Sequence, residues 1–107
     1  LTYSHDIARA FMWCLDHYNG EQILNIGSTE EHTIKEIAYW IADLMGIDRD
    51  RLEFDASKPT GQRRKSTDNT KFVRMSSFRY MPLKAALERT VEWFCKMSEE
   101  APELLRL

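Results

Sequence analysis

A loop rich in basic residues interrupts a chain that is otherwise patterned as helices and short strands. It runs from Phe54 to Lys65 and has no acidic residue after Asp55. Pro59 fixes one backbone angle, and Gly61 allows a tight turn or a close approach to a ligand, so no regular element is expected to run through this stretch. Its basic residues are Lys58, Arg63, Arg64 and Lys65.

The cationic loop, residues 57–65, has two interpretations. Basic side chains around a turn can converge on an anion, and the guanidinium fork of arginine matches the geometry of phosphate oxygens. Alternatively, the charges are solvated and only keep the protein soluble. The residues by themselves leave both interpretations open.

The charge balance argues against a molecule that is positively charged as a whole. The chain has 15 basic and 17 acidic residues, a formal net charge of -2. It therefore lacks the positive field that non-specific nucleic-acid binding needs, and a nucleic-acid binder using Arg63, Arg64 and Lys65 is disfavoured. Any anion binding must come from a local cluster.

Composition indicates one domain without metal. The 107 residues are 43% hydrophobic, which is enough for a core. Cys14 and Cys95 lie in helical stretches, and two reduced thiols are favoured over a disulfide, which the spacing does not exclude. His5, His17 and His32 lack ligand spacing with either cysteine. Without a membrane span or a signal peptide in the sequence, we expect a cytoplasmic protein or a piece of one.

Two helices are expected in the first half of the chain. Ser4 is a good N-cap for a helix over about residues 4–18. Thr33 and Glu36 form a capping box, in which each side chain bonds to the backbone of the other residue, and this box opens a second helix. Gly46 is placed to end that helix.

Two further helices are expected in the second half. Thr67 or Asp68 can cap a brief helix that Ser76–Ser77 ends, and Asp68 is interpreted as a helix cap rather than a ligand. Pro82 suits the first turn of a last helix. Residues 102–107 follow as a tail.

Two short strands are also expected, at Glu21–Ser28 and at Leu52–Phe54, because both combine apolar residues with strand-like spacing. Two strands alone are marginal in water, so a larger sheet would come from another part of the polypeptide. The predicted class is α/β, in the form of an α+β fragment with about four helices and two short strands and without a Rossmann core.

Four stretches share the pattern of one enzyme family. They are Tyr3–Ala8, Leu24–Ser28, Thr33–Ala38, and Phe54–Gly61 followed by Arg64, Lys65 and Asp68. Together they resemble the carboxy-terminal part of extended short-chain dehydrogenase/reductase enzymes, the NAD-dependent epimerase/dehydratase family, and within it the GDP-L-fucose synthases. The Ser-Lys-Pro-x-Gly motif at Ser57–Gly61 is the discriminating stretch. The chain departs from the family pattern at His5, Thr60 and Arg63.

The resemblance implies a role for each residue of the loop. Lys58 takes the place of the cation that faces the substrate diphosphate, and Arg64 with Lys65 matches the family's following Arg-Lys pair. Pro59 and Gly61 shape the loop. With the resemblance included, the phosphate interpretation of the loop becomes the favoured one.

The resemblance also implies the parent protein. Residues 1–101 would be the sugar-nucleotide-binding segment of an NADP-dependent GDP-sugar epimerase/reductase, with a tail over residues 102–107. Such an enzyme is both an isomerase and an oxidoreductase. Its partners would be a nucleotide sugar, with GDP-sugar favoured, a missing N-terminal Rossmann domain that holds NADP(H), and a second copy in a homodimer.

The chain itself lacks the signatures of cofactor binding and catalysis. Its four glycines are scattered, so no glycine-rich dinucleotide turn occurs. The only Tyr-x-x-x-Lys spacing, Tyr80 to Lys84, straddles Pro82 and is interpreted as chance. We therefore expect no catalytic residue and no cofactor in this chain. A stand-alone interaction or regulatory module that kept the scaffold is the alternative.

Overall fold

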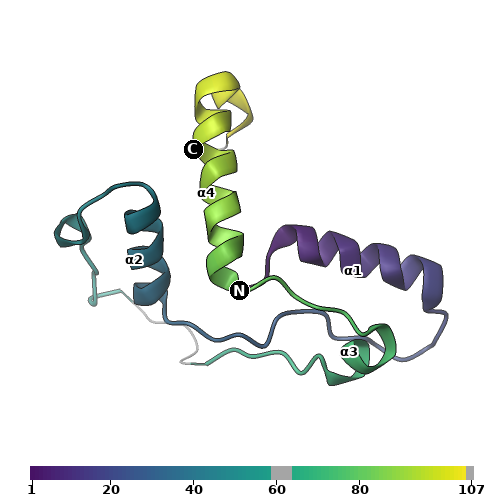
Figure 1. Ribbon diagram of the computed structural model, residues 1–107. Helices are drawn as coiled ribbons and strands as arrows, with labels where there is room; N and C mark the ends of the chain where they lie inside the picture. Colours follow the sequence, from purple (N-terminus) through teal and green to yellow (C-terminus); the bar gives the residue numbers. More distant parts are fainter. Residues whose placement is uncertain (59–63, 106–107) are drawn as a thin grey trace. The chain divides into compact units, whose positions relative to one another are not determined.

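The computed structural model describes residues 1–58 and 64–105, and its regular elements there are all helices (Figure 1). The elements are α1 (Ser4–His17), α2 (Ile34–Leu44), the 3-10 helix η1 (Arg49–Arg51), α3 (Thr70–Ser76), α4 (Leu83–Glu100) and the 3-10 helix η2 (Pro102–Leu104).

The chain divides into two compact units. Unit 1 comprises Leu1–Glu31 and Ala56–Leu83, and unit 2 comprises His32–Asp55 and Lys84–Leu107. Unit 1 therefore contains α1, α3 and the described residues of the cationic loop, and unit 2 contains α2, η1 and nearly all of α4.

The prediction of two short strands is wrong. Neither 21–28 nor 52–54 forms a strand, and no strand occurs elsewhere in residues 1–58 and 64–105. The described chain is helical rather than α/β. A strand is stable only where a neighbouring backbone pairs with it, and sequence patterning cannot supply that partner.

Side chains take the place of a strand partner around Gly27. The Gly27 N–H donates to the Tyr80 hydroxyl at 3.0 Å, and the Asn69 amide donates to the Gly27 carbonyl at 2.6 Å. The Ser28 N–H donates to the Thr2 hydroxyl at 2.9 Å. These bonds satisfy the irregular backbone of the segment without a β-ladder.

Helix α1 confirms the first predicted helix, but its start differs. Ser4 is the first helical residue, and Tyr3 occupies the N-cap position without a side-chain capping bond. The carboxylate of Asp6, which is 1% exposed, accepts the Met81 N–H at 2.7 Å and an Arg9 guanidinium N–H at 3.1 Å. A buried carboxylate therefore ties the first turn of α1 to the segment before α4.

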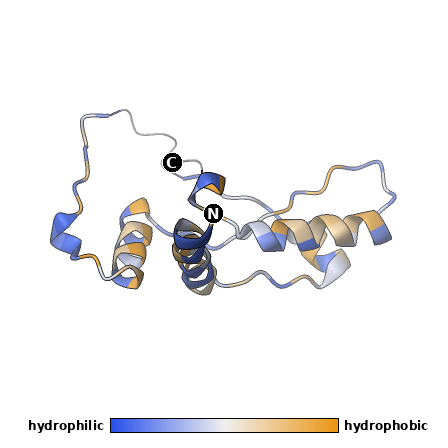
Figure 2. Cartoon of the chain, turned by 90° about the horizontal axis from the view of Figure 1, so that it is seen from above, coloured by the Kyte–Doolittle hydropathy of each residue, from blue (hydrophilic) through white to orange (hydrophobic). Residues whose placement is uncertain are grey.

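The capping box of α2 is confirmed. The Glu36 N–H donates to the Thr33 hydroxyl at 3.1 Å, and the Thr33 N–H donates to the Glu36 carboxylate at 2.7 Å. Hydrogen bonds that the Glu36 carboxylate accepts from the Thr33 N–H and the Thr33 hydroxyl hold the pKa of Glu36 below its ordinary value. Gly46 follows the helix with a left-handed φ of 66°, as expected of a helix end. Hydrophobic residues recur along the helix (Figure 2), and Ile37 and Ala42 are buried.

Helix α3 confirms the brief third helix. Asn69 occupies its N-cap position without a side-chain capping bond, while the Asp68 carboxylate accepts the Thr70 N–H at 3.0 Å. Hydrogen bonds from the Thr70 side chain and backbone lower the pKa of Asp68. The N-cap position is therefore Asn69 rather than the predicted Thr67 or Asp68, although Asp68 does bond to the first helical residue. Ser77 ends the helix with a left-handed φ of 53°.

A row of aromatic rings forms the core of unit 1. Phe72 on α3 is fully buried, and its ring centroid lies 5.5 Å from Trp13 on α1 and 5.3 Å from Phe78. Phe78 in turn lies 4.9 Å from Tyr80. Such tilted and edge-on ring contacts add to the free energy gained by burial.

Truncation of the central ring tests this core. Phe72→Ala is expected to lower the free energy of unfolding by about 3–5 kcal/mol, because it removes a fully buried ring and leaves a cavity. Urea denaturation followed by tryptophan fluorescence measures the change.

Met75→Ala is the matched control, because Met75 lies on the same helix and is 48% exposed. It is expected to change stability by about 0.5 kcal/mol or less. Equal losses in the two variants would contradict the assignment of Phe72 to the core.

Candidate functional site

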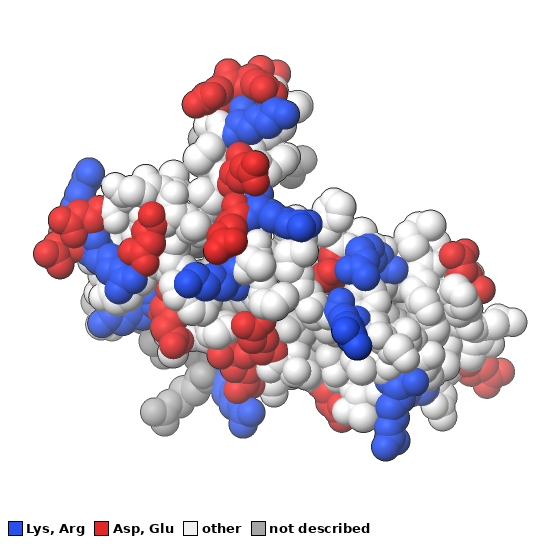
Figure 3. All heavy atoms as spheres, in the orientation of Figure 1, with Lys and Arg blue, Asp and Glu red and all other residues white. Residues whose placement is uncertain are grey.

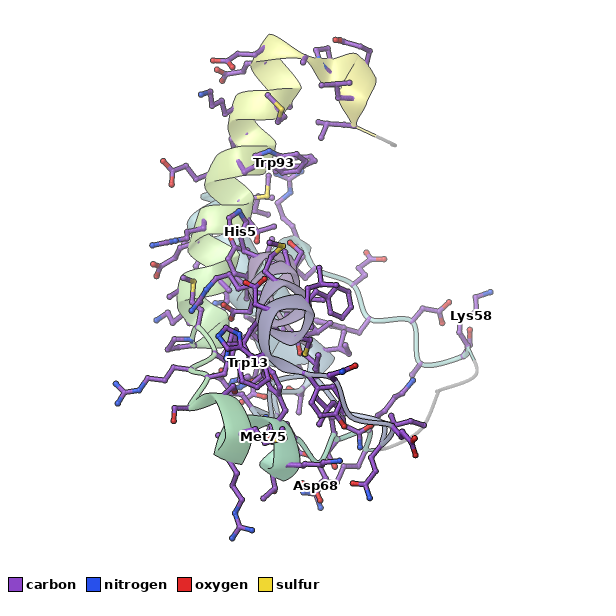
Figure 4. All side chains as sticks on the ribbon, turned by 90° about the vertical axis from the view of Figure 1, so that its right-hand side faces the viewer. His5, Trp13, Lys58, Asp68, Met75 and Trp93 are labelled. Atoms are coloured by element: carbon purple, nitrogen blue, oxygen red, sulfur yellow. The ribbon has the colours of Figure 1, made fainter. Side chains whose placement is uncertain are left out.

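The described cations of the loop occupy exposed positions. Basic and acidic side chains are interspersed on the face drawn in Figure 3, so any anion site depends on local geometry. Lys58 is exposed, and Figure 4 shows its side chain pointing away from α1. Lys65 is also exposed. Neither lysine has an ion pair or hydrogen bond with any residue that the structure describes.

Arg64 differs from the two lysines because it has a counterion. Its Nε donates to both carboxylate oxygens of Glu31, at 2.9 and 3.1 Å. This hydrogen-bonded carboxylate raises the pKa of Arg64. The side chains of Arg64 and Glu31 are 76% and 43% exposed, so solvent screens the pair and it adds little to stability. The main consequence of the Arg64–Glu31 pair is that it holds the Arg64 guanidinium beside Glu31.

Part of the predicted site lies outside the described residues. This holds for Pro59 and Gly61, which were expected to shape the loop, and for Arg63. Of the predicted diphosphate ligands, the structure joins Arg64 to Glu31 and leaves Lys58 and Lys65 exposed.

Four anchors hold the segment that carries Glu31, residues 27–31. Gly27 is fixed by two side-chain bonds and Ser28 by the Thr2 hydroxyl. The Glu30 carboxylate accepts the Leu83 N–H at 2.8 Å. Glu31 then receives Arg64 from the far end of the loop. The anchored segment therefore gives the loop a fixed point of attachment within unit 1.

Tyr80 has a structural role that sequence reasoning missed. The sequence offered only a formal Tyr-x-x-x-Lys spacing, whereas the structure assigns the hydroxyl to the Gly27 N–H. Burial raises the pKa of Tyr80 above its ordinary value of 10.0. The Asn-Ile-Gly-Ser stretch at Asn25–Ser28 singled out Gly27 in the sequence, but no local pattern predicts its hydrogen bond with Tyr80, 53 positions away.

The described cations of the loop have the chemistry to pair with an anion. Ammonium groups are compact point charges that attract phosphate, and arginine adds a bidentate fork. Within the described ranges no group of three or more histidine, cysteine, aspartate or glutamate side chains could hold a metal. No helix of the described residues is long and apolar enough to cross a membrane.

Comparisons with known proteins agree with the sequence pattern. No protein-family model matches the chain. It is 38% identical over 89 residues to a probable GDP-L-fucose synthase of Oryza sativa subsp. japonica, covering 83% of this chain and 27% of the relative. It is 34% identical over 91 residues to a GDP-L-fucose synthase of Arabidopsis thaliana, covering 85% of this chain and 28% of the relative.

A solved structure matches over more of the chain. The crystal structure of a GDP-L-fucose synthetase from Naegleria fowleri bound to NADP has a TM-score of 0.80 and 34% identity, covering 94% of this chain and 32% of that one. The chain thus spans 27% and 28% of the length of the two plant relatives.

The Gly27 anchor can be tested through Tyr80. Tyr80→Phe keeps the ring and removes the acceptor of the Gly27 N–H, so we expect a loss of about 1–3 kcal/mol in the free energy of unfolding. Urea denaturation measures this loss, and faster amide exchange at Gly27 locates it.

Tyr3→Phe is the control, because no hydrogen bond of the Tyr3 hydroxyl is recorded among the described residues. It removes the same hydroxyl group and is expected to leave stability and Gly27 exchange unchanged. If Gly27 exchanges at the same rate in wild type and in Tyr80→Phe, the bond does not hold the segment.

Proposed function

This chain is a GDP-L-fucose synthase-like segment, and from that premise we propose that it holds the diphosphate of a GDP-sugar within an NADP-dependent epimerase/reductase. The observation that carries the proposal is the exposure of Lys58 and Lys65, which flank residues 59–63 and have no counterion among the described residues. Two uncompensated ammonium groups on one loop favour a ligand with more than one negative charge.

The chemistry of a diphosphate suits these groups. A diphosphate brings about two negative charges, and hydrogen bonds between ionised partners are roughly twice as strong as neutral ones. Arg64 adds a third cation when its guanidinium exchanges the Glu31 carboxylate for phosphate oxygens. Glu31 thereby holds Arg64 in place before the substrate arrives.

In the proposed parent enzyme, the substrate is a GDP-4-keto-6-deoxyhexose that is epimerised and then reduced by hydride transfer. Residues 1–101 contribute substrate contacts, and residues 102–107 are a tail. The residues of this chain do not fit NADP(H), because the chain has no glycine-rich dinucleotide turn and the Tyr80 hydroxyl is engaged by Gly27. We therefore assign the cofactor and the acid, base and hydride chemistry to a separate Rossmann domain.

Titration with GDP tests the role of Lys58. Addition of GDP to the isotope-labelled chain is expected to shift the amides of residues 57–58 and 64–66 in NMR spectra. Lys58→Ala should weaken GDP binding about 3- to 10-fold, because it removes one charge-assisted hydrogen bond at an exposed site.

Lys96→Ala is the charge-matched control, because Lys96 lies on α4 in unit 2. It is expected to bind GDP as the wild type does. Guanosine without phosphate should cause none of these shifts. The proposal fails if Lys58→Ala and Lys96→Ala bind GDP equally, or if GDP shifts no loop amide.

The competition between Glu31 and phosphate for Arg64 gives a second test. Glu31→Gln removes the carboxylate that occupies the guanidinium, so GDP binding is expected to tighten about 2- to 5-fold. The same NMR titration measures the affinity.

A double-mutant cycle separates this effect from the general loss of one negative charge. In the Arg64→Gln background, Glu31→Gln should no longer tighten binding. Equal tightening in both backgrounds would show that Glu31 does not act through Arg64, which would contradict the competition.

A further inference from the structure

A groove in unit 1 lies along one face of α1, apart from the cationic loop. It encloses about 660 Å³, within the range of roughly 300–1,000 Å³ typical of small-molecule pockets. Residues of α1 at helical spacing form one side, and the segment that follows α3 forms the other. Figure 4 shows His5 and Trp13 on the same side of α1.

The groove has an aromatic and apolar wall. Trp13 and Phe78 both line it, and each also contacts the buried ring of Phe72, which fixes their positions. Met12 lines it as well and is 59% exposed. A flat apolar ligand would gain contact area here without displacing any core residue.

Two arginines give the groove a positive charge. The guanidinium carbon of Arg9 lies 4.9 Å from the Phe78 ring centroid, and one of its N–H groups donates to Asp6. Arg79 has no ion pair or hydrogen bond with a residue in the described ranges. Since Asp6 pairs with Arg9, Arg79 has no counterion among the residues that the structure describes.

The residues that line the groove carry no negative charge, and the nearby Asp6 carboxylate is paired with Arg9. No acidic residue lines the groove in the described part of unit 1. On the face drawn in Figure 3, the basic side chains over α1 lie on a largely uncharged surface. The charged Arg79 and the apolar side chains of Trp13, Phe78 and Met12 thus line the same groove, as in a site for an amphipathic ligand.

We propose that this groove binds a small aromatic anion. The ring lies against Trp13, Phe78 and Met12, and the acidic group, a carboxylate, sulfonate or phosphate, pairs with Arg79. Arg9, whose guanidinium lies over the Phe78 ring, contributes the N–H donors that do not bond to Asp6. The proposal involves none of Lys58, Arg64 or Lys65, so it does not depend on the proposed function.

Two fluorescent probes that differ in one group test the proposal. Anilinonaphthalene sulfonate carries the anionic group, and phenylnaphthylamine is its uncharged counterpart. The intact chain is expected to bind the sulfonate saturably, with amide shifts in residues 5–13 and 76–79. Arg79→Gln should weaken sulfonate binding at least about 5-fold and leave binding of the uncharged probe unchanged.

Arg74→Gln is the matched control, because Arg74 is an exposed arginine on α3 that does not line the groove. It should bind both probes as the wild type does, and equal urea midpoints for the two variants exclude a folding effect. Equal sulfonate affinity in the two variants, equal weakening of both probes by Arg79→Gln, or shifts confined to other residues would each overturn the proposal.

A GDP titration of the same variants separates the two proposals. Arg79→Gln is expected to retain the GDP response of the cationic loop, and Lys58→Ala is expected to retain sulfonate binding in the groove. If Lys58→Ala abolishes sulfonate binding, the anion lies on the loop and the groove proposal is wrong.

Discussion

The need to satisfy buried polar groups controls the structure of unit 1. Gly27 lies in a non-helical segment with no neighbouring strand, so its N–H and carbonyl are paired with the side chains of Tyr80 and Asn69. The buried carboxylate of Asp6 does the same for the Met81 N–H. Because an unpaired buried group is costly, these bonds fix which distant segments lie together.

These anchors connect the core to the candidate site. The aromatic row around Phe72 supports Tyr80, Tyr80 holds Gly27, and the segment from Gly27 leads to the Glu31 that receives Arg64. One end of the cationic loop is therefore attached to a packed framework. The lysines have no such attachment in the described residues, which leaves their ammonium groups accessible to a ligand.

The two proposed anion sites use different physics. The loop offers exposed cations, so its affinity for an anion depends on the number of cations and on screening by solvent. The groove offers one arginine without a counterion in the described residues, beside aromatic rings, so much of its binding energy comes from apolar contact. A diphosphate suits the first and an aromatic anion suits the second.

Local signals in the sequence indicated where the helices lie, although the N-cap positions of α1 and α3 are Tyr3 and Asn69 rather than the predicted residues. The capping box at Thr33 and Glu36 and the glycine at Gly46 act within one helical turn, so their bonds form wherever the chain is helical. The composition of the cationic loop and its family pattern were likewise visible without a structure. The sequence pattern also predicted Lys58, Arg64 and Lys65 as diphosphate ligands, but it did not predict which of them are paired and which are exposed.

Tertiary structure decided everything that depends on a distant partner. The two predicted strands do not form in the described residues because neither segment pairs with a neighbouring backbone. Apolar spacing in a sequence indicates that a segment is able to pair, but it does not reveal whether a partner lies beside it. Tyr80 meets Gly27 across 53 positions, Asp6 meets Met81 across 75, and Arg64 meets Glu31 across 33. No local pattern encodes such contacts, because burial and hydrogen-bond satisfaction select them only when the whole unit packs.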